Sequence, residues 1–152
     1  MATANISLTY NFSTLEGKID AETSRQGAFL RYENGESAYD DLKVHTNDQP
    51  TIDEYIHDAI ASVEKQFSDE LVSKTETGGV CTLGLYLPDC PTAAASAATD
   101  ELVRFIVLSV TARWLERRSF VNYSKAVMAN ADSSFQNAVR LLRTRNYLSS
   151  EN

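Results

Sequence analysis

The chain has few of the residues that build metal, redox or acid-base sites. Among its 152 residues are two cysteines and two histidines. Cys81 and Cys90 are separated by eight residues, which matches neither the close Cys pairs of zinc sites nor the redox Cys-x-x-Cys motif. His45 and His57 lie at neither a three- nor a four-residue spacing from each other or from a cysteine. The sequence therefore predicts no metal, no cofactor and two reduced structural thiols.

Known catalytic motifs and membrane segments are also missing. There is no Gly-x-Ser-x-Gly elbow, no phosphate-binding Gly-rich loop and no His-Glu-x-x-His helix. The acidic pair Asp40-Asp41 lacks the ligand spacing of an EF-hand, so we expect it in a solvated loop. No stretch approaches the roughly 18 apolar residues of a membrane span, and the first residues do not form a secretory signal. We expect a soluble protein that is not an enzyme and does not enter membranes.

Positive charge is scarce in the first two thirds of the chain. Residues 1–99 hold 6 Lys and Arg against 16 Asp and Glu, whereas residues 100–152 hold 8 against 5. General nucleic-acid binding needs a basic surface to displace counterions, so this balance disfavours it. The asymmetry instead suits head-to-tail contact between copies of one protein, and two solvated faces are the alternative.

Two short runs alternate apolar and polar residues and predict β-strands near residues 6–12 and 80–87. A two-stranded sheet is marginal in water, so the strands must pair over a helix or be completed by a neighbouring subunit. Their apolar residues are therefore candidate contacts between subunits. These candidates are Ile6, Leu8, Tyr10, Leu83 and Leu85.

Four longer segments have the apolar spacing of helices. The predicted helices cover residues 14–31, 51–73, 100–118 and 121–145. Ser13 with Glu16, and Thr51 with Glu54, have the spacing of capping boxes. Residues 32–50 are a polar connection with one helical turn near 38–42, and a loop of small residues precedes the third helix. The predicted fold class is mostly α: one domain over residues 1–152, with a bundle of about four helices and a small two-stranded β element.

Arginines gather in the last two predicted helices. A guanidinium pairs well with carboxylate or phosphate, so these residues are candidates for binding an acidic partner or nucleic acid. Solvated helix ends are the alternative. Because another copy would offer acidic residues, we expect ion pairs between subunits. The candidates are Arg113, Arg117, Arg118, Arg140 and Arg143.

The order of these segments resembles the helical head-to-tail connector, or neck ring, proteins of tailed bacteriophages, especially versions from phages and prophages of Bacteroides-type hosts. The resemblance covers most of the chain. It rests on a short strand before a helix ending in AETSRQGA at 21–28, on the helix at 51–72, on the strand at 81–87, and on the buried segment FIVLSVTARW at 105–114. The last helix, from Tyr123 onward, also fits.

The resemblance implies a ring of twelve copies docked beneath the portal protein and connected to other neck or tail proteins. Packaged DNA would pass through the channel without sequence-specific binding. The protein would then be a structural part of the virion, at the portal vertex, assembled in the host cytoplasm. The alternative is a monomeric acidic regulatory or inhibitor protein that occupies a basic site on its partner.

Overall fold

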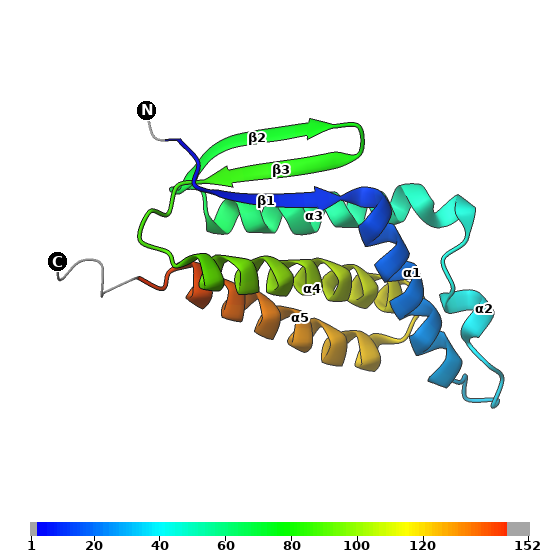
Figure 1. The fold of residues 1–152 in the computed structure, drawn as a ribbon. Coiled ribbons are helices and arrows are strands. Elements are labelled where there is room, and N and C mark those ends of the chain that lie inside the picture. Colours follow the sequence, from blue (N-terminus) through cyan, green and yellow to red (C-terminus); the bar gives the residue numbers. More distant parts are fainter. Residues whose placement is uncertain (1–2, 146–152) are drawn as a thin grey trace.

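The structure is a computed structural model that describes residues 3–145, and in it a small sheet covers a layer of helices (Figure 1). The sheet order is β1-β3-β2, and both strand pairs are antiparallel. The strands are β1 (Ile6–Asn11), β2 (Leu71–Thr77) and β3 (Val80–Leu85). The helices are α1 (Phe12–Phe29), α2 (Tyr39–Leu42), α3 (Gln49–Gln66), α4 (Thr92–Arg117) and α5 (Val121–Leu142), with a 3-10 turn at Thr46–Asp48. The predicted mostly α class with a small β element is confirmed.

The elements form layers that Figure 1 makes visible. Helices α3 and α4 run beneath the sheet, and α5 packs along the side of α4 away from the sheet. Helix α1 leaves the end of β1 and crosses toward α4 and α5, with the short α2 beside it. Gly78 and Gly79 have positive φ angles of 60° and 76°, which suit the two-residue turn of the β2–β3 hairpin.

The third strand, β2, corrects the predicted sheet and the predicted helix at 51–73. Helix α3 ends at Gln66, and the chain turns at Phe67 into β2. Phe67 and Leu71 are four residues apart and therefore continue the helical spacing of α3. Val72, Thr75 and Thr77 in the following stretch are β-branched, and the stretch leads into a Gly-Gly hairpin turn, so the local preference favours a strand.

Three helices begin earlier than predicted. Helix α3 starts at Gln49 with Asp48 at the N-cap position, so the predicted Thr51 cap is wrong. Helix α4 starts at Thr92, after Pro91, so the expected small-residue loop forms its first turns. Alanine has the highest intrinsic helix propensity, which explains why this segment is helical without an amphipathic pattern. Helix α1 starts at Phe12 and is capped by Asn11, whose side chain accepts a hydrogen bond from the Thr14 amide at 3.2 Å. The predicted Ser13 cap is therefore wrong by two residues.

Trp114 connects the two parts of the hydrophobic core. The larger part lies between the sheet and the helices and contains Trp114, whose side chain is fully buried. The smaller part lies where α1, α2, α4 and α5 meet, and it contains Leu42. The indole Nε1–H of Trp114 donates a hydrogen bond of 2.8 Å to the Leu42 carbonyl, which fixes α2 on α4.

Trp114→Phe tests this connection. The substitution removes the indole donor, leaves the Leu42 carbonyl without that hydrogen bond and creates a small void. We expect the free energy of unfolding to fall by about 2–4 kcal/mol in urea titrations followed by circular dichroism. Tyr123→Phe, at a side chain that is 53% exposed, is the control and should change it by less than about 0.5 kcal/mol. Equal effects of the two variants would contradict the role of Trp114.

Candidate functional site: the sheet edges and the groove beside α1

The apolar residues predicted to contact other subunits lie in the chain's own core. All five are at most 8% exposed, and they form the inner face of the sheet: Ile6, Leu8, Tyr10, Leu83 and Leu85. Because β3 is the middle strand, its backbone already pairs on both sides. These side chains are not available to a neighbouring subunit, which corrects the prediction. Burial also raises the pKa of the Tyr10 phenol.

Three of the five predicted arginines pair with acidic residues of the same chain. The ion pairs are Arg113–Asp58 at 2.6 Å, Arg118–Asp48 at 3.6 Å and Arg143–Glu70 at 2.7 Å. The three guanidinium groups also lie over aromatic rings, those of Tyr55, Trp114 and Phe67. The acidic and basic parts of the sequence thus meet inside one molecule. Within residues 3–145, Arg117 and Arg140 form no ion pair, and both are exposed.

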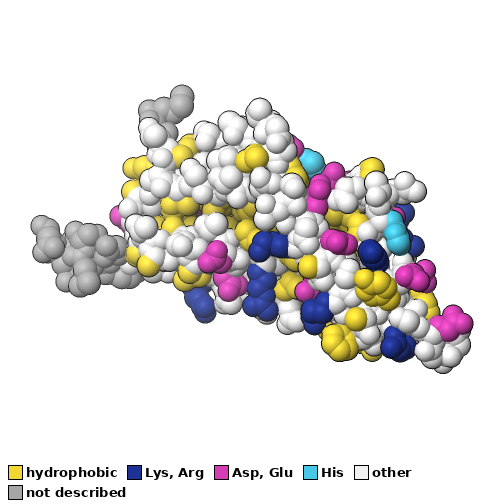
Figure 2. Space-filling view, turned by 45° about the vertical axis from the view of Figure 1, so that its right-hand side comes forward, with side chains coloured by type: hydrophobic (Ala, Val, Ile, Leu, Met, Phe, Trp, Pro, Cys, Tyr) yellow, Lys and Arg dark blue, Asp and Glu magenta, His cyan; other side chains and the backbone are white. Residues whose placement is uncertain are grey.

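A groove of about 910 Å³ opens between β1, α1, α4 and α5. Its apolar lining comes from Leu15, Val103, Val107, Leu108 and Val127. Its charged lining consists of Lys18, Glu22, Arg25, Asp100 and Arg104. Figure 2 shows hydrophobic side chains in a hollow beneath the sheet, with Lys and Arg side chains gathered beside it. The groove is therefore apolar with a mixed, slightly cationic rim.

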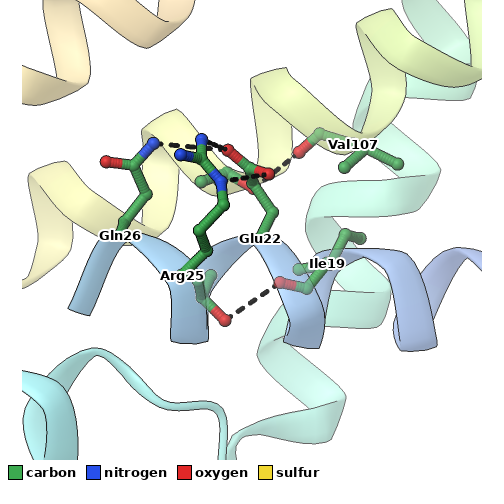
Figure 3. A network of polar contacts seen from close by, with 7 residues as sticks. Ile19, Glu22, Arg25, Gln26 and Val107 are labelled. Atoms are coloured by element: carbon green, nitrogen blue, oxygen red, sulfur yellow. Dashed lines mark hydrogen bonds and ion pairs between the residues drawn. The ribbon is translucent and has the colours of Figure 1, made fainter. Parts of the chain in front are cut away.

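A network on α1 neutralises one of the groove's cations (Figure 3). Glu22 accepts hydrogen bonds from Arg25 at 2.5 Å and from Gln26 at 3.3 Å. The Arg25 guanidinium lowers the pKa of the Glu22 carboxyl. Lys18 and Arg104, by contrast, are exposed and form no ion pair in the part of the chain that the structure describes. These two cations are the groove's free positive charges.

The free edge of β1 borders this groove, because Thr9 and Asn11 belong to its lining. The Phe12 amide donates to the Gly79 carbonyl at 2.9 Å, so the even-numbered residues of β1 direct their backbone groups to β3. The backbone N–H and C=O groups of Ser7 and Thr9 and the N–H of Asn11 consequently point away from the sheet, whereas the carbonyl of Asn11, the N-cap residue, belongs to the first turn of α1.

Strand β2 forms the opposite edge and is exposed along nearly its whole length. Every residue of β2 after Leu71 is exposed. Lys74 and Glu76 reach α3, where Lys74 pairs with Glu64 at 2.7 Å and Glu76 with His57 at 2.6 Å. Ion pairs with α3, in place of apolar burial, hold this strand over the helix layer.

The outer face of the sheet carries hydroxyl groups and no charge. In the middle row, Thr9 pairs with Thr82 and Thr82 with Thr75. The hydroxyl oxygens of Thr9 and Thr82 are 3.5 Å apart. The hydroxyl-bearing residues of this face are Ser7, Thr9, Ser73, Thr75, Thr77 and Thr82. This face could have been predicted from the sequence, because Ser and Thr recur at every second position of β1 and β2.

A pair of carboxyl groups joins the beginnings of α1 and α3. Glu16 and Asp53 share a hydrogen bond, and this bond raises the pKa of Glu16 to about 7. Phe12 stacks on the His57 ring beside them, at 4.8 Å between centroids. Residues 3–145 contain no group of three or more His, Cys, Asp or Glu side chains placed to hold a metal ion. Both cysteines are free thiols, and burial raises their pKa values.

None of the helices in the described part of the chain is long and apolar enough to cross a membrane. Comparison of the chain with protein-family models, curated proteins and solved structures finds no significant match. The candidate site therefore depends on the geometry alone. It consists of two open sheet edges, an uncharged outer face between them and a groove beside one edge.

Glu16→Gln tests the carboxyl pair. Folded Glu16 keeps its proton up to about pH 7, while the ordinary pKa is 4.5. The pair therefore stabilises the fold fully below pH 4.5, and its contribution is lost as the pH rises through 7. A glutamine amide donates to Asp53 at every pH, so the variant should gain stability relative to wild type between pH 5 and pH 8 in thermal melts.

The control for this experiment is Glu54→Gln, which neutralises an exposed acid on α3, next to Asp53 in the sequence, without removing either member of the pair. The difference in melting temperature between Glu54→Gln and wild type should be nearly the same at pH 5 and at pH 8. A Glu16→Gln difference that is also independent of pH would show that the two carboxyls share no proton.

Proposed function

We propose that this chain is a structural subunit that assembles with copies of itself into a ring at the head-to-tail junction of a tailed bacteriophage. The observation that carries the proposal is the pair of open edges, β1 and β2, on opposite sides of one sheet. The resemblance of the segment order to connector proteins supports it independently.

Opposite, different edges favour head-to-tail assembly over a two-fold dimer. A two-fold contact uses the same patch on both partners, whereas a head-to-tail contact joins two different surfaces. Repetition of a head-to-tail contact gives a ring when the rotation closes. The resemblance implies twelve copies, contact with the portal protein and with other neck or tail proteins, and a place in the virion.

The charge of the chain fits a channel that DNA passes without binding. The net charge is −7, and three arginines of the basic C-terminal part are occupied by acids of the same chain. A surface with few free cations gives phosphates little to bind, so DNA slides past without sequence-specific contacts.

A monomeric acidic regulatory protein is the second candidate. The turn between α1 and α2 and the start of α2 favour it, because Glu33 and Glu36 of the turn and Asp40 of α2 are all exposed. Such a surface suits a basic site on another protein. This candidate needs no self-assembly.

The two proposed functions predict different particle masses in solution, and they differ in whether the chain is present in the virion. We expect sedimentation velocity and negative-stain electron microscopy, with and without the portal protein of the same phage, to show ring-shaped particles. We also expect mass spectrometry to find the chain in purified virions. A protein that remains monomeric under all these conditions and is absent from virions would contradict the ring and leave the acidic regulator.

A further inference from the structure

The two outer strands run in the same direction. Each is antiparallel to β3, so β1 and β2 are parallel to each other on opposite sides of the sheet. A second copy placed beside the first in the same orientation would bring its β2 next to β1. Parallel strands form evenly spaced backbone hydrogen bonds, and such a pair needs unpaired groups on both facing edges.

Within residues 3–145, both edges carry backbone groups that the sheet leaves unpaired. On β1 they are the groups of Ser7 and Thr9 and the N–H of Asn11, as the pairing with β3 requires. On β2 the hairpin turn pairs Thr77 with Val80, so Lys74 and Glu76 direct their backbone groups outward. Natural proteins usually protect such edges. The bulge at Leu71/Ser73 leaves the stretch 73–77 regular.

We propose that β2 of one copy pairs in parallel with β1 of the next, so that the sheets of neighbouring subunits join head to tail. The inference rests on the proposed ring and names the contact that builds it. The regular stretch 73–77 of β2 matches the stretch 7–11 of β1 in length. The partner is a second copy of this chain.

The side chains on the outer face are compatible with this pairing. Alternate residues of both strands are hydroxyl-bearing or amide-bearing and uncharged: Ser7, Thr9 and Asn11 on β1, and Ser73, Thr75 and Thr77 on β2. Side chains on neighbouring strands interact directly, and like charges there are destabilising. The joined sheets would continue one uncharged outer face across the subunit boundary.

Charge beneath the sheet is also complementary. The ion pairs Lys74–Glu64 and His57–Glu76 tie β2 to α3, so a neighbour that adds its β2 also brings its α3. That helix carries Asp53, Glu54, Asp58 and Glu64 against a single Lys65. Asp53, Asp58 and Glu64 already interact with Glu16, Arg113 and Lys74 of their own chain, so exposed Glu54 is the acid left for a neighbour among the described residues. It would approach the groove bordered by β1, where Lys18 and Arg104 lie free of ion pairs among the described residues.

Cysteine cross-linking tests the contact directly, with Thr9→Cys and Thr75→Cys combined in a Cys90→Ala background. The two positions lie in one row with Thr82 between them, so they are about 9.5 Å apart within a chain. A disulfide requires Cα atoms within about 7 Å, so no bridge forms inside one copy. Across the proposed contact the two positions are neighbours on the same face.

Mild oxidation of the double variant should give a ladder of dimers, trimers and larger species on non-reducing gels. Each single variant should give dimers at most. The matched control combines Thr9→Cys with Ser133→Cys, an exposed position on α5, and should give no ladder. A double variant that cross-links no better than this control would overturn the inference.

Thr9→Pro, compared with Thr9→Ser, tests the backbone pairing. The Thr9 N–H makes no bond within the sheet, so proline removes only the donor offered to a neighbour. We expect self-association, measured by sedimentation, to weaken about tenfold or more in Thr9→Pro and to stay unchanged in Thr9→Ser. Thermal melts show whether both variants fold. If Thr9→Pro does not fold, the cross-linking of the double cysteine variant alone tests the inference.

The outcomes separate the inference from the proposed function. Rings that form equally well from Thr9→Pro, without a cross-linking ladder, would refute the strand pairing and leave the ring intact. A wild-type chain that neither assembles nor cross-links would refute both. Loss of assembly in Thr9→Pro alone, together with the ladder, would support both.

Discussion

The fold depends on one buried surface, the inner face of the sheet against α3 and α4. Leu8 and Tyr10 of β1 and Leu83 and Leu85 of β3 fill this interface, and all four are almost fully buried. Because alternate residues of a strand point to opposite faces, burying these side chains commits the remaining positions to the outer face. The hydroxyl-rich outer surface follows from this burial, and the strand order β1-β3-β2 leaves β1 with a free edge.

The charge asymmetry of the sequence is largely resolved within the fold. Acids of the first two thirds pair with arginines of α4 and α5 or of the residues that follow these helices: Asp48, Asp58 and Glu70 with Arg118, Arg113 and Arg143. Partly exposed pairs of this kind contribute little stability individually. They affect binding specificity instead, because an arginine that forms an intramolecular ion pair binds the acidic groups of other molecules less strongly. In the proposed assembly, contacts between copies therefore rely more on backbone edges than on charges.

The helices and the two strands with a buried apolar face were largely predictable from the sequence, whereas β2 and the groove were not. Helices α1, α2 and α5 and strands β1 and β3 were predicted near their observed bounds, whereas the helix predicted at 51–73 ends seven residues earlier and α4 begins eight residues before the predicted 100. Strand β2 was missed because its side chains are exposed on both faces and Lys74 and Glu76 replace apolar residues toward α3. The groove was not predictable either, since its lining comes from four elements that are distant in sequence.

The position of β3 in the sequence also affects synthesis. Strand β1 pairs only with β3, whose residues lie about 70 positions later, and this long separation slows folding. Helices α4 and α5 are neighbours in sequence and can form early. A nascent chain therefore leaves the ribosome with its first strand unpaired until the β2–β3 hairpin has emerged. During that interval the strand is exposed to other nascent chains on the same messenger RNA.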